Sequence, residues 1–124
     1  MATIDTNIDT NHQLTIHTIV GEVLAEEISD KIRTYSESGP TNYVLWDFSR
    51  AVLDKIKSHD VEIFISLTSQ YASYRKGGKT ALVFSSDLGF GLGREFDTYT
   101  DLKESRIPYM TFRRKEDAIK WLLE

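Results

Sequence analysis

The sequence contains no cysteine and only two prolines among its 124 residues. Without cysteine, the chain has no disulfide framework, no thiolate nucleophile and no zinc or iron–sulfur site with cysteine ligands. No stretch approaches the roughly 18 uninterrupted apolar residues typical of a membrane-spanning helix. The segment from Met1 to Asn11 also lacks the basic and apolar regions of a secretion signal. We therefore expect a cytoplasmic protein without a transmembrane segment.

An excess of positive charge is also missing. The 15 Lys and Arg residues are outnumbered by 19 Asp and Glu residues, so the formal net charge is −4 at neutral pH. Non-specific binding of nucleic acid needs clustered Lys and Arg, and we therefore expect no nucleic-acid partner. With 40% hydrophobic residues, the chain has enough apolar surface to fold as one domain spanning residues 1–124.

Apolar periodicity gives the order of the secondary-structure elements. Patterns typical of strands cover Ala2 to Ile8, Leu14 to Val20, Tyr43 to Phe48, Thr80 to Phe84 and Ile107 to Phe112. Patterns typical of amphipathic helices cover Val23 to Tyr35, Val61 to Ala72, Leu88 to Leu102 and Glu116 to Leu123. The order β-β-α-β-α-β-α-β-α predicts an α/β fold, with a mixed, largely parallel sheet, an N-terminal β-hairpin and four helices. The nearly continuous apolar run from Tyr43 to Phe48 predicts a central strand.

Folds of this kind bind ligands beyond the carboxyl ends of their parallel strands. In this sequence those ends lead into Ser49 to Lys57, Ser85 to Gly93 and Arg113 to Lys115. Asp47 stands near the end of an apolar run, so its carboxylate is predicted to lie where sites of this fold are built. The commoner alternative is that Asp47 only accepts hydrogen bonds from loop N–H groups.

Three glycines, Gly89, Gly91 and Gly93, alternate near the start of the predicted third helix. Their spacing does not match a dinucleotide fingerprint, whose last glycine would fall on Arg94. Because each glycine costs a helix about 1 kcal/mol relative to alanine, we expect a compensating contact. Close packing against the sheet is the commoner compensation. The alternative is close approach by a ligand or a second subunit, with Arg94 and free helix N–H groups favouring an anion.

The candidate site combines residues from two of these loops. Ser86 and Asp87 are predicted to cap the third helix, and Phe90 lies off its apolar stripe and is expected to be exposed. The predicted ligand-binding or interface residues are Asp47, Ser49, Ser86, Asp87, Phe90, Gly91 and Arg94.

The tripeptide Gly78-Lys79-Thr80 resembles the end of a phosphate-binding loop, in which the lysine reaches the phosphates and the hydroxyl holds Mg²⁺. The match fails because Ser73 replaces the earlier glycine and because the tripeptide enters a strand instead of opening a helix. We therefore predict a turn between a helix and a strand, in which glycine supplies a positive φ.

The three histidines do not form a metal site by their spacing. His12, His17 and His59 show no arrangement typical of metal ligands, and we expect neither a metal nor a cofactor. Ser58, His59 and Asp60 include the residue types of a hydrolytic triad, but adjacent positions on a helix do not face one another. Ser58 is instead predicted to be the N-cap of the second helix.

Two motifs resemble the small SpoIIAA-like proteins, which are related in fold to STAS domains of anti-sigma-factor antagonists and to CRAL-TRIO lipid-binding domains. The motifs are Val44-Leu45-Trp46-Asp47-Phe48-Ser49 and Ser86-Asp87-Leu88-Gly89-Phe90-Gly91-Leu92-Gly93-Arg94-Glu95-Phe96. The resemblance covers nearly the whole chain and implies a bacterial, non-catalytic binding or regulatory module. The relation to CRAL-TRIO domains implies a small apolar or amphipathic ligand.

The resemblance also implies a phosphorylation site. In STAS regulators the helix after the central strand begins with a D-S-S-G-type phosphorylation motif, on which a kinase partner docks. Ser58 occupies the corresponding place here and is the candidate phosphoacceptor. The surrounding segment, Asp54 to His59, departs from the family motif, which weakens this assignment.

Three functions therefore remain open. The favoured one is a STAS-like module that self-associates as a homodimer and binds a small apolar or anionic ligand. The second is a phospho-regulated domain of the anti-sigma-factor-antagonist type, with a regulatory protein as its partner. The third, an enzyme that uses Asp47 as an acid–base group, has no visible pair of nucleophile and base to support it.

Overall fold

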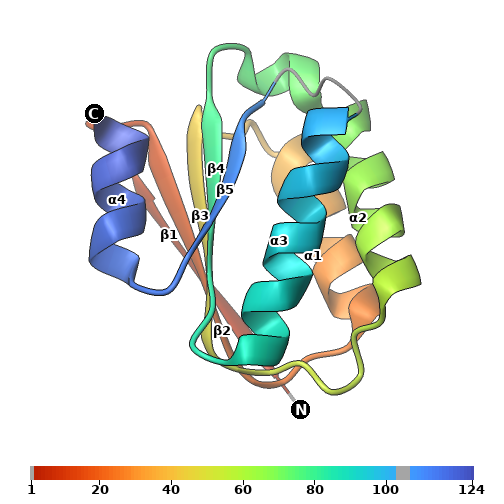
Figure 1. Cartoon of the computed structure of the whole chain (residues 1–124). Helices are drawn as coiled ribbons and strands as arrows, with labels where there is room; N and C mark the ends of the chain where they lie inside the picture. The colour runs from red at the N-terminus through yellow and green to blue at the C-terminus, as the bar shows by residue number, and fades with distance from the viewer. Residues whose placement is uncertain (1, 103–106) are drawn as a thin grey trace.

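A computed structural model of the chain describes residues 2–102 and 107–124 (Figure 1). Its elements are β1 (Thr3–Asp9), β2 (Leu14–Glu22), α1 (Ala25–Glu37), β3 (Tyr43–Val52), α2 (Ser58–Gln70), the 3₁₀ helix η1 (Ala72–Arg75), β4 (Lys79–Val83), α3 (Asp87–Leu102), β5 (Tyr109–Phe112) and α4 (Lys115–Leu123). This order confirms the predicted mixed α/β fold. The one element without a predicted counterpart is the short helix η1, which joins α2 to β4.

The five strands form one sheet in the order β1-β2-β3-β4-β5. β1 pairs antiparallel with β2, and every other neighbouring pair is parallel. The predicted hairpin and the predicted central strand are both confirmed. β3 lies in the centre because its apolar run can be buried on both faces of the sheet.

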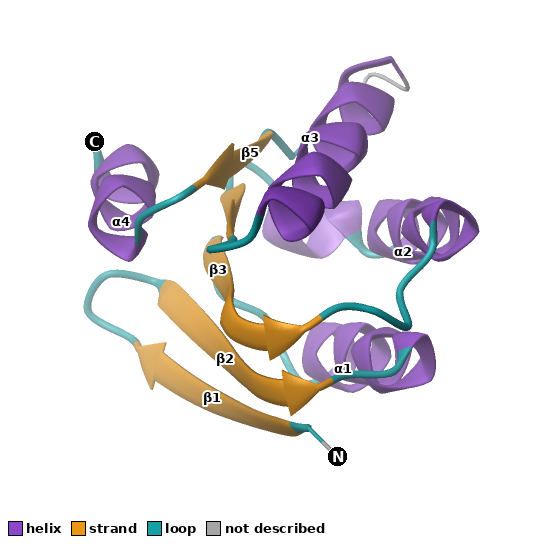
Figure 2. Cartoon of the chain, turned by 60° about the horizontal axis from the view of Figure 1, so that its bottom comes forward, coloured by secondary structure: helices purple, strands orange, loops and turns teal. Residues whose placement is uncertain are grey.

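The sheet separates two cores of unequal size. Helices α1, α2 and α3 cover one face and α4 covers the other, as Figures 1 and 2 show. Side chains alternate along β3, so Trp46 and Phe48 join the larger core, whereas Leu45 packs with Leu122 of α4. No described helix has both the length and the apolar character needed to cross a membrane.

Strands β2 and β3 are longer than predicted. The segment beginning at Ser49 is predicted to be a loop, but β3 continues to Val52. It can do so because β2 continues through Gly21, whose φ of +95° favours glycine, and offers a partner along this stretch. A register shift between Thr18 and Val20 accommodates the extension.

Candidate functional site

The predicted site lies at the carboxyl edge, the edge of the sheet where the parallel strands end. Gly89 N donates to Ser86 Oγ at 3.0 Å, which confirms that Ser86 caps α3. Asp87 Oδ1 accepts a hydrogen bond from Arg113 Nη2 at 2.9 Å, and the same guanidinium lies 4.2 Å from the centre of the Phe90 ring. Phe90 is half-buried, not exposed as predicted, because its ring packs against the larger core and contacts this guanidinium.

The three glycines of α3 fall into two groups. A Cβ added to Gly89 would lie 2.7 Å from Cδ1 of Phe84, and one added to Gly93 would lie 2.6 Å from Cε2 of the same ring. These two glycines therefore allow α3 to pack closely on the end of β4. Gly91 is exposed, and a Cβ there would meet no atom within 4 Å. Packing thus explains two of the glycines, and open surface surrounds the third.

Contrary to the prediction, Asp47 does not lie at the carboxyl end of its strand. Asp47 is 94% buried in the interior of β3, because that strand continues to Val52. Asp47 Oδ1 accepts a hydrogen bond from Ser49 N at 2.9 Å, and Ser49 O accepts one from Ser85 Oγ at 2.7 Å. Alternation along β3 turns Asp47 toward the face covered by α4, whereas Arg94 is exposed on α3 beyond the other face. The structure therefore does not bring Asp47 and Arg94 together.

Ser58 is the first residue of α2 and not its N-cap. Lys57 holds the cap position, and its backbone N donates to Asp60 Oδ2 at 2.9 Å. The predicted capping role of Ser58 is therefore wrong, because the Asp60 carboxylate satisfies the cap residue's N–H instead. The exposed Ser58 hydroxyl donates to Glu95 Oε2 at 3.3 Å and links α2 to α3.

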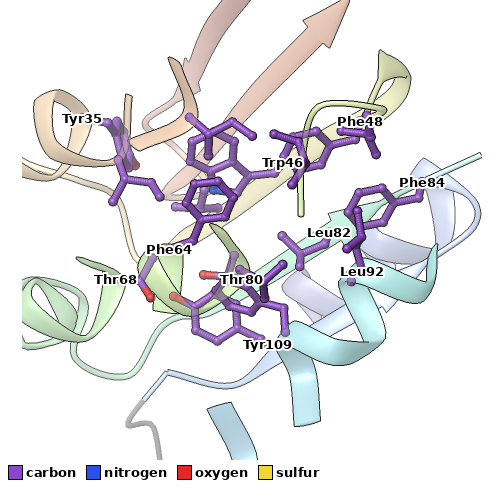
Figure 3. A pocket seen from close by; sticks show the side chains of 18 of the residues that line it. Tyr35, Trp46, Phe48, Phe64, Thr68, Thr80, Leu82, Phe84, Leu92 and Tyr109 are labelled. Carbon is purple, nitrogen blue, oxygen red and sulfur yellow. The ribbon is translucent and has the colours of Figure 1, made fainter. Parts of the chain in front are cut away.

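A second candidate site lies inside the larger core. A cavity of about 90 Å³ lies between the sheet and helices α1, α2 and α3. Large rings of the sheet and of the helices point into it (Figure 3). The apolar part of its wall is formed by Ile28, Ile32, Val44, Trp46, Phe48, Leu53, Ile56, Val61, Phe64, Leu82, Phe84, Leu92 and Phe96. Tyr35, Ser36, Thr68, Arg75, Thr80, Gly93 and Tyr109 complete the wall. The cavity is thus apolar over most of its length and polar near Arg75.

Arg75 joins the beginnings of two strands at the amino edge, the edge where the parallel strands start. Its Nε donates to Thr41 O at 3.1 Å, and its Nη1 donates to Thr80 Oγ1 at 2.7 Å. Its Nη2 donates both to Asn42 O at 2.9 Å and to Lys79 O at 2.7 Å. The side chain is anchored because η1 directs it back between the start of β3 and the start of β4.

Tyr35 extends this polar region toward β2. The Tyr35 hydroxyl donates to Thr15 Oγ1 at 2.7 Å and accepts from Thr41 N at 2.9 Å. The hydroxyls of Thr15 and Thr41 lie 2.7 Å apart, and all three residues are buried. We call Thr15, Tyr35, Thr41, Arg75 and Thr80 the amino-edge cluster.

The guanidinium of Arg75 is a buried charge with neutral partners. Burial lowers its pKa, and the neighbouring Tyr109 and Tyr35 offset part of this effect. A hydrogen bond between Arg75 and the Tyr109 hydroxyl also raises the pKa. None of the ion pairs within residues 2–102 and 107–124 includes Arg75. The cluster therefore provides hydrogen-bond acceptors for the guanidinium but no compensating negative charge.

His17 lies beside the cluster in a fully buried position on β2. Its Nδ1 is 2.9 Å from Thr6 Oγ1, and its ring centre lies 4.6 Å from that of Tyr35 and 4.3 Å from that of Trp46. Burial, together with the positive charges of Lys31 and Arg75, lowers the pKa of His17 to about 3. The imidazole is therefore neutral at pH 7, and its Nε2 has no hydrogen-bond partner among the described residues.

Sequence reasoning missed the amino-edge cluster. Arg75 precedes Lys76 and Gly77, a pattern typical of an exposed turn, and Gly77 does adopt the predicted positive φ of +82°. A signal was nevertheless present in β2. Thr15 and His17 share the strand face of Ile19, so strict alternation predicts that both polar side chains are buried.

Comparison with known proteins gives the fold a class. No protein-family model and no curated protein sequence matches the chain. An anti-sigma factor antagonist from Mycobacterium paratuberculosis has a similar structure, with a TM-score of 0.65 and 15% identity over 100% of this chain and 96% of that one. An uncharacterised DUF3478-family protein from Shewanella loihica, described as having a SpoIIAA-like fold, gives a TM-score of 0.62 at 16% identity over 98% and 93%.

The anti-sigma factor antagonist SpoIIAA in its unphosphorylated form is also similar. Its TM-score is 0.55 at 20% identity, and the match covers 96% of both chains. The protein therefore has the SpoIIAA-like fold, and the fold implied by its two sequence motifs is confirmed.

Proposed function

We propose that the protein is a non-catalytic binding module that holds a small apolar molecule in the cavity beneath α1, α2 and α3. The observation that supports this most directly is the cavity wall, in which Trp46, Phe64 and Phe84 present apolar rings to an interior space of about 90 Å³. An apolar cavity of about 150 Å³ binds benzene. A smaller molecule of a few carbon atoms fits the present space.

Titration with 1-butanol, followed by methyl NMR, tests this proposal. We expect the largest shift changes at cavity methyls such as Ile32 and Leu82, and little change at Leu45 and Leu122 in the smaller core. Absence of any saturable change up to the solubility limit of 1-butanol would contradict the proposal.

Two matched variants locate the binding site. Val44→Ile adds one methylene group at the cavity wall, and Val83→Ile makes the same change on the face covered by α4. We expect Val44→Ile to weaken 1-butanol binding and Val83→Ile to leave it unchanged. Equal effects of the two changes would show that the molecule binds elsewhere.

A second candidate function is regulation by phosphorylation at Ser58, in a domain that binds a regulatory protein. The fold similarity to anti-sigma factor antagonists supports it, as does the exposure of Ser58 at the start of α2. Ser58 Oγ donates to the Glu95 carboxylate, and a phosphate would replace this donor with negative charge. Phosphorylation would thus separate the start of α2 from α3.

Intact-mass analysis of protein isolated from its own cells tests this second function. A mass increase of one phosphate that maps to Ser58, and that disappears in Ser58→Ala, is the expected result. Unmodified protein under every growth condition would contradict it.

The start of α3 is the surface on which a protein partner, a second copy or a regulator, is proposed to dock. Val52 and Leu88 are 43% and 55% exposed there, and open space surrounds Gly91. Native mass spectrometry of the purified chain measures its subunit count directly. A homodimer that dissociates in Leu88→Asp would support self-association at this surface, and a monomer at all concentrations would contradict it.

A further inference from the structure

We infer that the cavity ligand is a short monocarboxylic acid, with its carboxylate beside Arg75 and its alkyl chain among the aromatic rings. The inference rests on the proposed function and specifies the chemical class of the ligand. It starts from a cavity that combines one buried cation with a long apolar wall.

The buried charge of Arg75 favours an anionic ligand. Arg75 is 92% buried, and its partners are three carbonyl oxygens and neutral hydroxyls. A buried charge without an opposite charge is costly in a protein interior. A ligand anion would supply the compensating charge that no described carboxylate supplies by an ion pair.

The hydroxyl groups beside Arg75 also favour an anion. Thr80 Oγ1 accepts a hydrogen bond from Arg75, and the Tyr109 hydroxyl is also hydrogen-bonded to this guanidinium. A hydroxyl that accepts from a cation turns its own proton away from that cation. Both side chains line the cavity and are seen there in Figure 3. The cavity therefore offers two O–H donors next to a positive charge, a combination that suits carboxylate oxygens.

The apolar end limits the rest of the ligand. Phe48, Leu53 and Phe84 form the wall at the carboxyl-edge end, so a second charge there would be desolvated without a partner. A dicarboxylate is thereby disfavoured, and an amine would be repelled by Arg75. A volume of about 90 Å³ is smaller than that of a cavity of about 150 Å³, which accommodates benzene. The chain is therefore short, on the order of three to five carbon atoms.

Three probes of equal length and different head group test the inference: butyrate, 1-butanol and n-butylamine. The full chain is titrated with each probe at neutral pH, and the shifts of cavity methyl groups are followed by NMR. We expect butyrate to bind about tenfold or more tightly than 1-butanol, because charge-assisted hydrogen bonds are stronger than neutral ones. n-Butylamine is expected to bind more weakly than either.

The outcomes separate the two proposals. Equal affinities for butyrate and 1-butanol would overturn the carboxylate assignment and leave the apolar binding module intact. Absence of saturable binding by all three probes would overturn both. Perturbation by butyrate at exposed Lys or Arg residues only, with no change at the cavity methyls, would also overturn the carboxylate site.

A variant that keeps the fold locates the head group. Tyr109→Phe removes one proposed O–H donor and keeps the half-buried ring, whereas Tyr74→Phe makes the same change on an exposed ring outside the cavity. We expect Tyr109→Phe to weaken butyrate binding several-fold more than 1-butanol binding, and Tyr74→Phe to change neither. If Tyr109→Phe leaves the ratio of the two affinities unchanged, the carboxylate does not lie at this end of the cavity.

Discussion

The two edges of the sheet differ in how far their polar side chains are buried. At the carboxyl edge, Ser86, Asp87 and Arg113 are exposed: Ser86 accepts a hydrogen bond from Gly89 N, and Arg113 donates one to Asp87. At the amino edge, Arg75 and Thr80 are buried and fix the beginnings of the strands from inside the core. The carboxyl edge therefore resembles an ordinary solvated surface, whereas the amino edge holds groups that are expensive to bury.

Binding chemistry in this fold is therefore better sought among buried polar groups than among exposed ones. Exposed polar groups cost little, so their presence at the usual ligand edge says little about function. A buried guanidinium lining an apolar cavity needs a reason, and strand anchoring explains only its hydrogen bonds.

Replacing the buried arginine is expected to have the largest effect. Arg75→Met removes the donor to four acceptors and leaves Thr41 O and Thr80 Oγ1 buried without it. We expect the free energy of unfolding to fall by about 3–5 kcal/mol, measured by urea denaturation. Arg94→Met, at an exposed position of α3, should change it by less than about 0.5 kcal/mol. Similar losses in the two variants would remove the distinction between the edges.

His17 should make the amino edge sensitive to acid. Burial lowers its pKa to about 3 in the folded state, whereas an exposed histidine in the unfolded chain titrates near 6.5. Below pH 6.5 the unfolded state therefore binds more protons, so stability is complete above that pH and falls as pH drops toward 3. The slope approaches about 1.4 kcal/mol per pH unit below pH 6, which amounts to about 2 kcal/mol between pH 6.5 and pH 4.5.

Urea denaturation at several pH values measures this slope. His17→Gln, which cannot titrate, should lose most of it even if its stability at pH 7 is lower. His59→Gln, which removes an exposed ring at the start of α2, is the matched control. A wild-type slope in His17→Gln would assign the acid sensitivity to other groups.

Much of the fold could be predicted from the sequence because burial leaves a periodic signal. The central position of β3 follows from its run of apolar residues, and the cap of α3 follows from Ser86 at its start. The end of β3 was missed because its last residues, from Ser49 to Val52, alternate with exposed side chains and mimic a loop. Their strand conformation depends on the partner strand β2, which local sequence does not specify.

The cavity and its arginine could not be predicted in the same way. The residues that follow Arg75 have a composition typical of an exposed turn. Its side chain is directed inward by the path of η1, which the sequence pattern did not predict. The volume of the cavity depends on how α1, α2 and α3 pack on the sheet. The periodicity of apolar residues in the sequence does not predict this packing. The residues of the predicted site on α3 are neighbours on one helix, whereas the burial of Asp47 inside its strand depends on where β3 ends.

Gly93→Ala tests the packed side of α3 and should have an intermediate effect. The new Cβ would lie 2.6 Å from Cε2 of Phe84 and 2.7 Å from Cγ2 of Thr111, so α3 must move away from the sheet. We expect a loss of about 1–3 kcal/mol in the free energy of unfolding, measured by urea denaturation. An unchanged free energy of unfolding would show that Phe84 and Thr111 can shift to accommodate the added methyl group.

Gly91→Ala makes the same chemical change on the open side of the same helix and should have the smallest effect, with the opposite sign. No atom lies within 4 Å of the added Cβ, so alanine gains helix propensity without a clash. We expect the free energy of unfolding to rise by about 0.5–1 kcal/mol, measured by urea denaturation. Loss of stability together with a lower subunit count in native mass spectrometry would show that a second copy packs on this surface. The carboxyl edge would then be an interface between subunits, and its polar groups would need the same explanation that Arg75 needs at the amino edge.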